Sequence, residues 1–347
     1  KFSIYSSSEI AGLTNYWGQQ FFDYRKNEYW PKMIFKKFSL YKKNLEILDK
    51  LYPSANIKIF KKKISNGFTI NQFTAPLVKS PIVKKSNLKK IAKKKLIHDR
   101  IISFKKINKN LIKVYTEKSI FYCKRLILCA GPIGNALILL KSFKIIKHLK
   151  FRDDNPRLMF GIKTGKNAVI PDKKKLSDVE IMKNNKTILY STIYNFNPDH
   201  FNFFLKPFIN IFKNILTNFF YYGLFWTADE YNEITLTSYN NKIFLSGKNF
   251  NFKKERVNII KQMSNIGLKV LKIWNLKFAY GFHYHGLRVN FKGKFLTLND
   301  FLNKMELKNH IHCFDSSIIS KISNKPPTKT YLATSNYLIQ KFLNKNK

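Results

Sequence analysis

The sequence predicts an α/β protein whose later part is α+β. Three observations predict this fold class. Apolar and polar residues alternate in short runs between residues 56 and 122, and a continuous apolar run then leads through a glycine turn into a helical pattern. The segment from 155 to 276 holds scattered strand patterns without that order, which indicates a second structural unit with a mixed or antiparallel sheet.

Residues 1–50 combine a loop with a helix. The stretch SEIAGLTNYWGQQFFDY is punctuated by glycine, which is typical of a loop. The stretch IFKKFSLYKKNLEILDKLY has apolar residues at helical spacing. Period-two alternation follows in IKIF, FTINQFTAPLV, KKLIHDRIISFKKI and LIKVYTEKSIFYC. This alternation predicts antiparallel or mixed strands.

The stretch RLILCAGPIGNALILLKS predicts a strand, a glycine turn and a helix. Its almost uninterrupted apolar start is typical of a strand that is covered on both faces. Pro132 falls near the first turn of the predicted helix, where proline is tolerated. Such a turn can present backbone N–H groups to a phosphate or a dinucleotide at the carboxyl edge of a sheet. Taken alone, the motif is a weak indication of a nucleotide site.

The middle and the end of the chain predict further elements. KTILYSTIYNF, EITLTSY and KIFLSG have the pattern of strands, and VNIIKQMSNIGLKVLKIW has that of an amphipathic helix. The aromatic stretch from 201 to 226 favours a buried core helix over one that lies flat in a membrane interface. Near the end, a strand is expected before FDSS, and KTYLATSNYLIQKFL predicts a closing helix.

The composition excludes a disordered chain, because 44% of the residues are hydrophobic and 16% are aromatic. The formal charge of +44 favours a polyanionic partner. Lysine is nevertheless spread along the chain with Asn, Ile and Phe, which indicates a compositional bias. The clusters at 61–63 and 89–95 also lack the interleaved aromatic residues on which bases stack. We therefore expect no specific nucleic-acid partner.

The location expected from the sequence is the cytoplasm. Cys123, Cys129 and Cys313 have neither metal nor disulfide spacing, which favours reduced thiols. The start of the chain lacks the apolar region of a signal peptide. The uncharged stretch from 214 to 228 is shorter than the roughly 20 residues of a spanning helix, so no transmembrane segment is expected. A peripheral membrane contact stays open.

Four segments resemble, in order, the glucose-methanol-choline (GMC) oxidoreductases. AGLTNYWG resembles the GGxSxxW segment of that family, and LILCAGPIGNALILL resembles its strand, AAGAIG turn and Leu-rich helix. GFHYHG resembles the HxxG motif, and FDSSIISKISNKPPTKTYLATSNYLI is similar to DASVFP...PTLTIMALAERIA. The FHxxG form and the Pro-Thr before the last helix are similar to the bacterial branch whose members occur with sugar and surface-polysaccharide genes.

The resemblance implies an FAD-dependent oxidoreductase that oxidises the CH–OH group of an alcohol or a sugar by hydride transfer to flavin, with an unknown electron acceptor. It implies an FAD-binding Rossmann-like domain over 1–154 and 277–347 and a substrate-binding domain over 155–276. The residues it implies for cofactor binding are Gly12, Thr14, Asn15, Trp17, Gly18, Ala130, Gly131, Gly134, Asp315, Ser316, Ser317 and Thr330.

His283 matches the catalytic position of the HxxG motif, and Gly286 matches its glycine. An imidazole, with an unperturbed pKa of about 6.5, suits the removal of a hydroxyl proton near neutrality. The residues themselves leave two alternatives open, because His283 and His285 could be structural or could be two ligands of a metal. No third ligand is evident, so no metal is expected. Asp315 could likewise cap a turn.

The sequence departs from the family pattern at two places. It contains no GxGxxG turn, and the resemblance puts that turn before AGLTNYWG, so we expect a truncated FAD domain that is incomplete at its N-terminus. The His or Asn that partners the catalytic histidine is replaced by Pro326, Pro327 and Thr328. Thr328 is therefore the second catalytic candidate, as a hydrogen-bond donor to the substrate.

An alternative function stays open. The charge of +44, the missing GxGxxG turn and the altered partner position also suit a degenerate, non-catalytic relative or a basic polyanion-binding protein.

Overall fold

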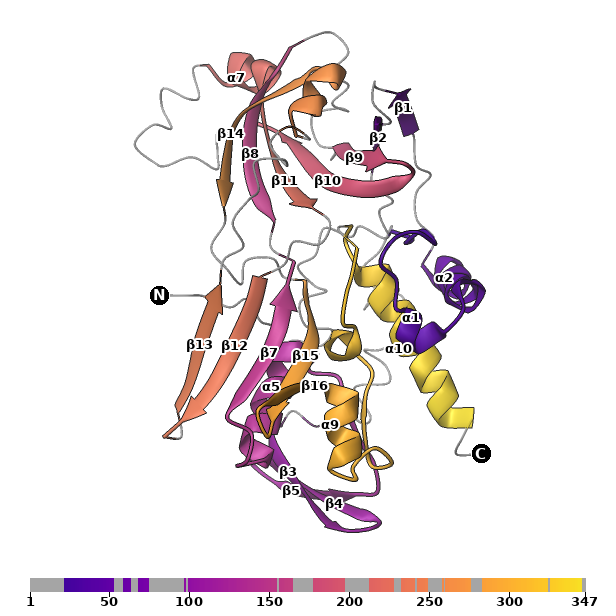
Figure 1. The fold of residues 1–347 in the computed structure, drawn as a ribbon, viewed down its shortest axis with the longest axis vertical. Helices are drawn as coiled ribbons and strands as arrows, with labels where there is room; N and C mark the ends of the chain where they lie inside the picture. The colour runs from indigo at the N-terminus through magenta and orange to yellow at the C-terminus, as the bar shows by residue number, and fades with distance from the viewer. Residues whose placement is uncertain are drawn as a thin grey trace.

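The fold combines α-helices with largely antiparallel sheets (Figure 1), which confirms the predicted mixture of α and β elements. The structure is a computed structural model. It describes residues 22–52, 59–63, 68–74, 97, 99–154, 156–164, 177–196, 212–227, 232–240, 242–248, 258, 260–275, 283–323 and 325–344.

The largest sheet has seven described strands, which are antiparallel throughout and run in the order β1-β2-β9-β10-β11-β8-β14. Their bounds are β1 (Ile59–Lys63), β2 (Phe68–Thr74), β8 (Arg157–Lys163), β9 (Ser177–Lys183), β10 (Lys186–Asn195), β11 (Phe220–Thr227) and β14 (Leu268–Asn275). β1 and β2 thus come from the part of the chain before residue 154 and join strands that follow it.

A second sheet has the order β13-β12-β7-β15-β16. It consists of β7 (His148–Asp153), β12 (Asn232–Tyr239), β13 (Lys242–Lys248), β15 (Tyr284–Phe291) and β16 (Lys294–Thr297). Helix α9 (Leu298–Lys304) follows β16 and packs against this sheet, with Thr297 as its N-cap. The pairing of β12 with β7 therefore crosses the boundary between 154 and 155, and β7 joins β12 and β13 to β15 and β16 in one sheet.

The strand, glycine turn and helix predicted at RLILCAGPIGNALILLKS are confirmed as β6 (Leu126–Leu128) and α5 (Gly131–Ser142). β6 pairs in parallel with β17 (Ile311–Cys313). The expectation that both faces of β6 are covered is wrong, because Ile127 is 43% exposed while Leu126 and Leu128 are buried. Neighbouring side chains on a strand point to opposite faces, and only one face of β6 contacts the core.

The alternating runs between 101 and 123 form a three-stranded antiparallel sheet of β3 (Ile101–Asn108), β4 (Leu111–Thr116) and β5 (Ile120–Cys123). Phe104, Ile112 and Val114 point inward and pack in one hydrophobic cluster with α5 and β7. In Figure 1 this sheet lies at the opposite end of the long axis from the seven-stranded sheet.

The helices α1 (Lys32–Phe35), α2 (Phe38–Leu51) and α10 (Thr328–Asn344) lie together at one side of the molecule (Figure 1). They share a hydrophobic cluster that includes Phe35, Tyr41, Leu45 and Ala333. The helical spacing predicted for the segments of α2 and α10 is confirmed. The short 3-10 helix η5 (Ser316–Ile318) connects β17 to the segment before α10.

Two expectations for the middle of the chain are wrong. The predicted amphipathic helix VNIIKQMSNIGLKVLKIW ends in the short 3-10 helix η4 (Gln262–Ile266), after which β14 begins. Gly267, with a φ of +79°, ends η4 in the left-handed region, where glycine is not strained. Within the described residues, the aromatic stretch forms helix α7 (Lys213–Phe219) and then strand β11, since Tyr221, Gly223 and Phe225 alternate as buried positions; positions 201–211 lie outside the described residues. In the part of the chain that the structure describes, no helix has the length and apolar character needed to cross a membrane.

Candidate functional site

The glycine turn at the start of α5 lies against the turn that follows β17. The parallel pairing of β6 with β17 places both turns at the same edge of the sheet. The backbone N–H of Gly131 donates a hydrogen bond of 2.7 Å to Oδ2 of Asp315. A carboxylate at a helix N-terminus is favourable because it meets the positive end of the helix dipole. Asp315 thus contacts the first residue of α5, and as the N-cap of η5 it also caps its own turn, which is the alternative that the sequence left open.

Both oxygens of Asp315 accept further hydrogen bonds. Oδ1 accepts from the N–H of Ser317 at 2.8 Å, and Oδ2 accepts from the side chain of Asn135 at 2.9 Å. The same Asn135 amide also donates to Oγ of Ser317 at 2.9 Å. Asn135 is fully buried and was not among the predicted site residues, because a single Asn in an apolar helix gives no signal in the sequence.

The two glycines of the turn have different roles. Gly131 has a φ of +69°, and a Cβ added there would meet nothing within 4 Å, so the space in front of this residue is open. A Cβ on Gly134 would lie 2.7 Å from Cβ of Ala130, so Gly134 is needed for the close packing of the turn itself. Of these residues, Gly131 is therefore the one beside which a ligand can lie.

The predicted residues of the last helix lie at its first turns. Thr328 begins α10, and Thr330 is buried with its hydroxyl 2.7 Å from the Tyr41 hydroxyl of α2. Ser316 and Ser317 are also buried. The Thr330 hydroxyl therefore joins α10 to α2. This contact does not bring it to the Gly131 turn. Gly12, Thr14, Asn15, Trp17 and Gly18 lie outside the described residues.

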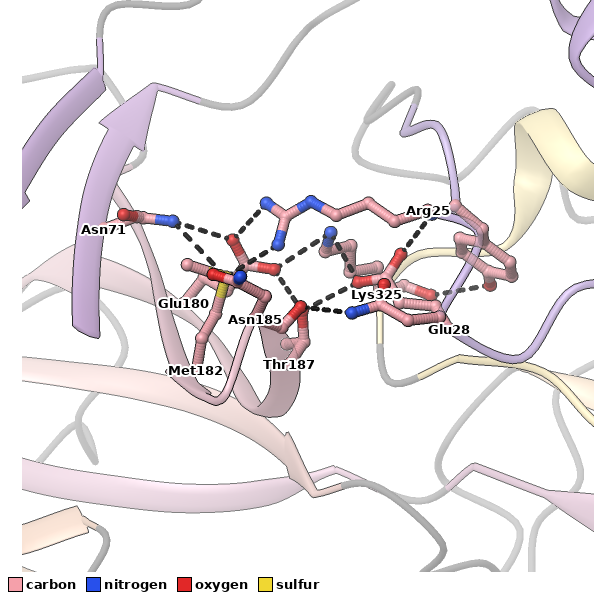
Figure 2. A network of polar contacts seen from close by, with 10 residues as sticks. Arg25, Glu28, Asn71, Glu180, Met182, Asn185, Thr187 and Lys325 are labelled. Carbon is pink, nitrogen blue, oxygen red and sulfur yellow. Dashed lines mark hydrogen bonds and ion pairs between the residues drawn. The ribbon is translucent and has the colours of Figure 1, made fainter. Parts of the chain in front are cut away.

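A buried ion network holds the chain just before α10 (Figure 2). The Lys325 ammonium lies 2.8 Å from a carboxylate oxygen of Glu28 and 2.9 Å from one of Glu180. The side chains of the three residues are 5%, 2% and 2% exposed, respectively. Arg25 completes the charge balance, because its guanidinium lies 2.7 Å from Oε2 of Glu180. Two cations thus meet two carboxylates, which is the condition for burying such charges.

Neutral groups satisfy the rest of this network, as Figure 2 shows. Thr187 donates to Glu28 at 2.7 Å and also hydrogen-bonds Glu180, while Asn71 donates to Glu180 at 3.1 Å. The hydroxyl of Tyr24 donates to the carbonyl of Lys325 at 3.0 Å. The network therefore ties strands β2, β9 and β10 to the start of α10 and fixes how that helix faces the large sheet.

The HYHG segment begins the strand β15 and contains a bulge. The pairing of β15 with β7 shifts register between His285 and Arg288. Gly286 sits in this bulge with a φ of +65°, and a Cβ there would lie 3.1 Å from the carbonyl oxygen of Ile319. The glycine of the predicted motif is thus required both by backbone conformation and by the close approach of the segment after η5.

His283 precedes this bulge and packs on an aromatic ring. Its imidazole stacks on the indole of Trp226, with 5.8 Å between ring centroids. Trp226 is buried, and its Nε1 donates to the carbonyl of Asp154 at 3.1 Å. The Nδ1 atom of His283 is buried and has no hydrogen-bond partner among the described residues. Burial lowers the pKa of His283 to about 4, so the ring is neutral near pH 7.

His285 has a structural environment. It is 1% exposed, and its Nδ1 donates to the carbonyl of His283 at 2.9 Å. Burial lowers the pKa of His285 to about 3. Across the described ranges, no group of three or more His, Cys, Asp or Glu side chains is arranged to hold a metal ion.

Tyr331, on the first turns of α10, supplies a second unpartnered polar group. Its hydroxyl is buried and has no hydrogen-bond partner in the described part of the chain. Burial, and after it the nearby carboxylates of Asp154, Asp153 and Asp315, raise the pKa of Tyr331 well above its ordinary value. The hydroxyl therefore stays protonated and can donate a hydrogen bond at any physiological pH.

His283, Trp226, Asp154 and Tyr331 define the candidate site. It lies where β7 ends and β15 begins, between the two large sheets and the start of α10 (Figure 1). Within the described ranges, the imidazole nitrogen of His283 and the hydroxyl of Tyr331 have no hydrogen-bond partner, and groups of this kind can hydrogen-bond a ligand. The sequence indicated His283 but not Tyr331, which has the pattern of an ordinary core residue.

Comparison with known proteins adds no assignment. No family model matches the sequence, and no curated protein matches it.

Proposed function

We propose that the protein is an FAD-dependent oxidoreductase of the GMC type, which oxidises the CH–OH group of an alcohol or a sugar. The observation that carries the proposal is the state of His283. This imidazole is neutral near pH 7 and stacks on an aromatic ring, and its buried Nδ1 has no hydrogen-bond partner in the part of the chain that the structure describes. It is the residue that the HxxG resemblance puts at the catalytic position.

A neutral imidazole is the form that accepts a proton. Oxidation of an alcohol requires a base that removes the hydroxyl proton while hydride leaves the carbon. Burial favours the neutral form of His283, and the stacked indole of Trp226 fixes the ring plane. The bulge at Gly286 and the pairing of β15 with β7 fix the backbone next to His283. His283 is thus positioned as a general base rather than as a cation.

The residues around the Gly131 turn fit the hydroxyl-bearing part of FAD. The open space at Gly131 allows a ligand to approach the backbone. The neighbouring Asp315 carboxylate favours hydroxyl donors and disfavours a phosphate, and it already occupies the N–H of Gly131. We therefore assign this turn, with Ser316 and Ser317, to the polyol of the flavin and not to its pyrophosphate. When bound, FAD supplies the hydride acceptor.

The substrate side of the site carries groups that suit a hydroxylated ligand. Tyr331 offers a hydroxyl donor, and Trp226 is an aromatic residue of the kind on which sugar rings pack. Thr328, at the first position of α10, is the nearest replacement in sequence for the missing His or Asn partner. We propose Thr328 as a donor to the substrate oxygen. We place this chemistry in the cytoplasm, in keeping with three free thiols.

The proposal is tested by flavin binding and reduction. The full gene product is mixed with FAD, and the flavin absorbance is followed when sugars and simple alcohols are added without oxygen. Bleaching of the flavin bands by a CH–OH compound is expected. A protein that binds no FAD, or a bound flavin that no member of the panel reduces, contradicts the proposal and favours the non-catalytic alternative.

Polyanion binding is a second candidate function for the molecule. A specific observation favours it, namely the exposed basic and aromatic face of the β3–β4–β5 sheet.

A further inference from the structure

The outward face of the three-stranded sheet brings lysine and tyrosine side chains together. Lys113 lies opposite Tyr122 in the register of β4 with β5, and Tyr115 lies opposite Ile120. Lys105 of β3 lies opposite Lys113. Directly paired residues share a face of a sheet, and so do residues two apart on one strand. All five side chains therefore stand on one face, which we call the Lys-Tyr face.

This face is open to solvent. Tyr122 is 59% exposed and Ile120 is 52% exposed, while the opposite face of the same strands is buried against α5. Large apolar surface that is left exposed on a sheet is a sign of an interaction site.

The surroundings are strongly basic. Residues 99–125 contain eight Lys and Arg and two carboxylates, Asp99 and Glu117. Asp99 accepts a hydrogen bond of 2.6 Å from the Thr116 hydroxyl, and Glu117 is paired with Arg100 at 3.5 Å. The electrostatic field of this region therefore favours an anionic partner over a neutral or a cationic one.

Lys113 lies between the two tyrosines. Its ammonium is 5.1 Å from the ring centroid of Tyr115 and 5.7 Å from that of Tyr122. The two rings are diagonal neighbours on adjacent strands, a spacing of about 7–8 Å. A cation therefore lies near two aromatic rings that come from adjacent strands. Base stacking on aromatic rings, with lysine at the backbone, is the mode by which proteins bind single strands without reading sequence.

The sequence hides this arrangement. The lysine clusters at 61–63 and 89–95 have no aromatic residues among them, and the expectation of no specific nucleic-acid partner depended on that absence. Tyr115 and Tyr122 become neighbours of one lysine only when β4 pairs with β5. The antiparallel pairing of β4 with β5 thus places aromatic side chains beside a lysine, which the sequence alone does not show.

We infer that the Lys-Tyr face binds single-stranded nucleic acid without sequence preference. A duplex keeps its bases stacked inside, so only its phosphates can reach the lysines, whereas a single strand offers both phosphates and free base faces. The face lies at the far end of the molecule from the seven-stranded sheet (Figure 1), so the inference is independent of the proposed oxidoreductase function.

The test measures binding of a fluorescent thymidine oligonucleotide to the full chain by anisotropy, over a series of salt concentrations. Tyr122→Ala is expected to weaken binding about 5-fold or more, because one stacked base is lost, while the dependence on salt stays the same. Tyr122→Phe keeps the ring and is expected to retain binding. Tyr239→Ala removes a tyrosine that is 66% exposed on β12 and serves as the matched control.

A second variant separates stacking from charge. Lys105→Gln removes a charge from the same face, and it is expected to reduce the slope of log affinity against log salt by about 0.7. The inference is overturned if Tyr239→Ala weakens binding as much as Tyr122→Ala, or if Tyr122→Phe binds as poorly as Tyr122→Ala. It is also overturned if duplex DNA or heparin binds as tightly as the single strand, since that result indicates charge without stacking.

Discussion

The imidazole of His283 stacks on the indole of Trp226 with 5.8 Å between the ring centroids, which joins the start of β15 to the end of β11. The two strands belong to different sheets. The contact therefore places the candidate base at the junction of the two sheets, where its desolvation lowers the pKa. The proposed role of His283 thus depends on how the two sheets meet, and the predictions below concern this pair and the elements that hold it.

The rate of oxidation should depend on the protonation of His283. With a pKa of about 4, the imidazole is protonated and inactive below that pH and neutral above it. We expect kcat/KM, measured over a buffer series, to rise with pH through about 4 and to be level near neutrality. The pH dependence of this ratio reports the ionisation of groups in the free enzyme. A profile that rises only near the ordinary histidine pKa of about 6.5 contradicts the buried environment assigned to His283.

Tyr331→Phe should separate ligand binding from stability. The substitution removes only a buried hydroxyl that has no hydrogen-bond partner among the described residues, so the free energy of unfolding should stay equal or increase. If that hydroxyl donates to the ligand, KM or the FAD dissociation constant should increase about 5-fold or more, a typical loss for one hydrogen bond. Thermal melts and substrate titrations on the same preparation measure both. If neither ligand binding nor stability changes, Tyr331 does not belong to the site.

Lys325→Ala should destabilise the fold strongly. It leaves the buried carboxylates of Glu28 and Glu180 without their shared cation, and breaking such a pair costs about 3–5 kcal/mol. Urea unfolding measures the loss. Arg100→Ala, at an ion pair whose side chains are 69% and 50% exposed, is the control and should change stability by less than about 1 kcal/mol. Equal effects of the two variants contradict a role of the Lys325 network in holding α10.

The same network predicts sensitivity to acid. Burial opposes the ionisation of Glu180, but Lys325 and Arg25 outweigh it and lower the pKa from 4.5 to about 2. The stabilisation is therefore fully present above pH 4.5 and is lost as the pH falls towards about 2. Unfolding free energies measured through this range should fall with acid, and Glu180→Gln should flatten that part of the curve. If the curve of the variant is as steep as that of the wild type, groups other than Glu180 cause the acid sensitivity.

The secondary structure was predictable where local pattern and tertiary packing agree. The helical spacing in α2 and α10 and the strand–glycine–helix sequence of β6 and α5 both led to the observed elements. The pattern failed at 268–274, because apolar positions in LKVLKIW fit both a helix and an edge strand, and Gly267 decides between them. It failed again at β11, whose aromatic residues suit a buried strand as well as a helix.

The site was predictable only in part. The resemblance grouped Gly131 with Asp315, and the parallel pairing of β6 with β17 brings the two residues together. Lys325 and Glu180 gave no signal, because single charged residues in a lysine-rich chain do not reveal their partners before folding. Tyr331 was not recognised either, because one tyrosine on an amphipathic helix has the pattern of core packing.

The measurement that tests the central claim most directly compares flavin reduction in the wild type and in His283→Ala. Both proteins are loaded with FAD, mixed with the best reducing substrate without oxygen, and followed by the loss of flavin absorbance. His148→Ala, at an exposed histidine of β7, is the control. We expect His283→Ala to bind FAD as the wild type does and to lose at least about 100-fold in the reduction rate, which is the lower range for a general base. Full-rate reduction by His283→Ala would contradict the account, because the proton would then be taken by another group.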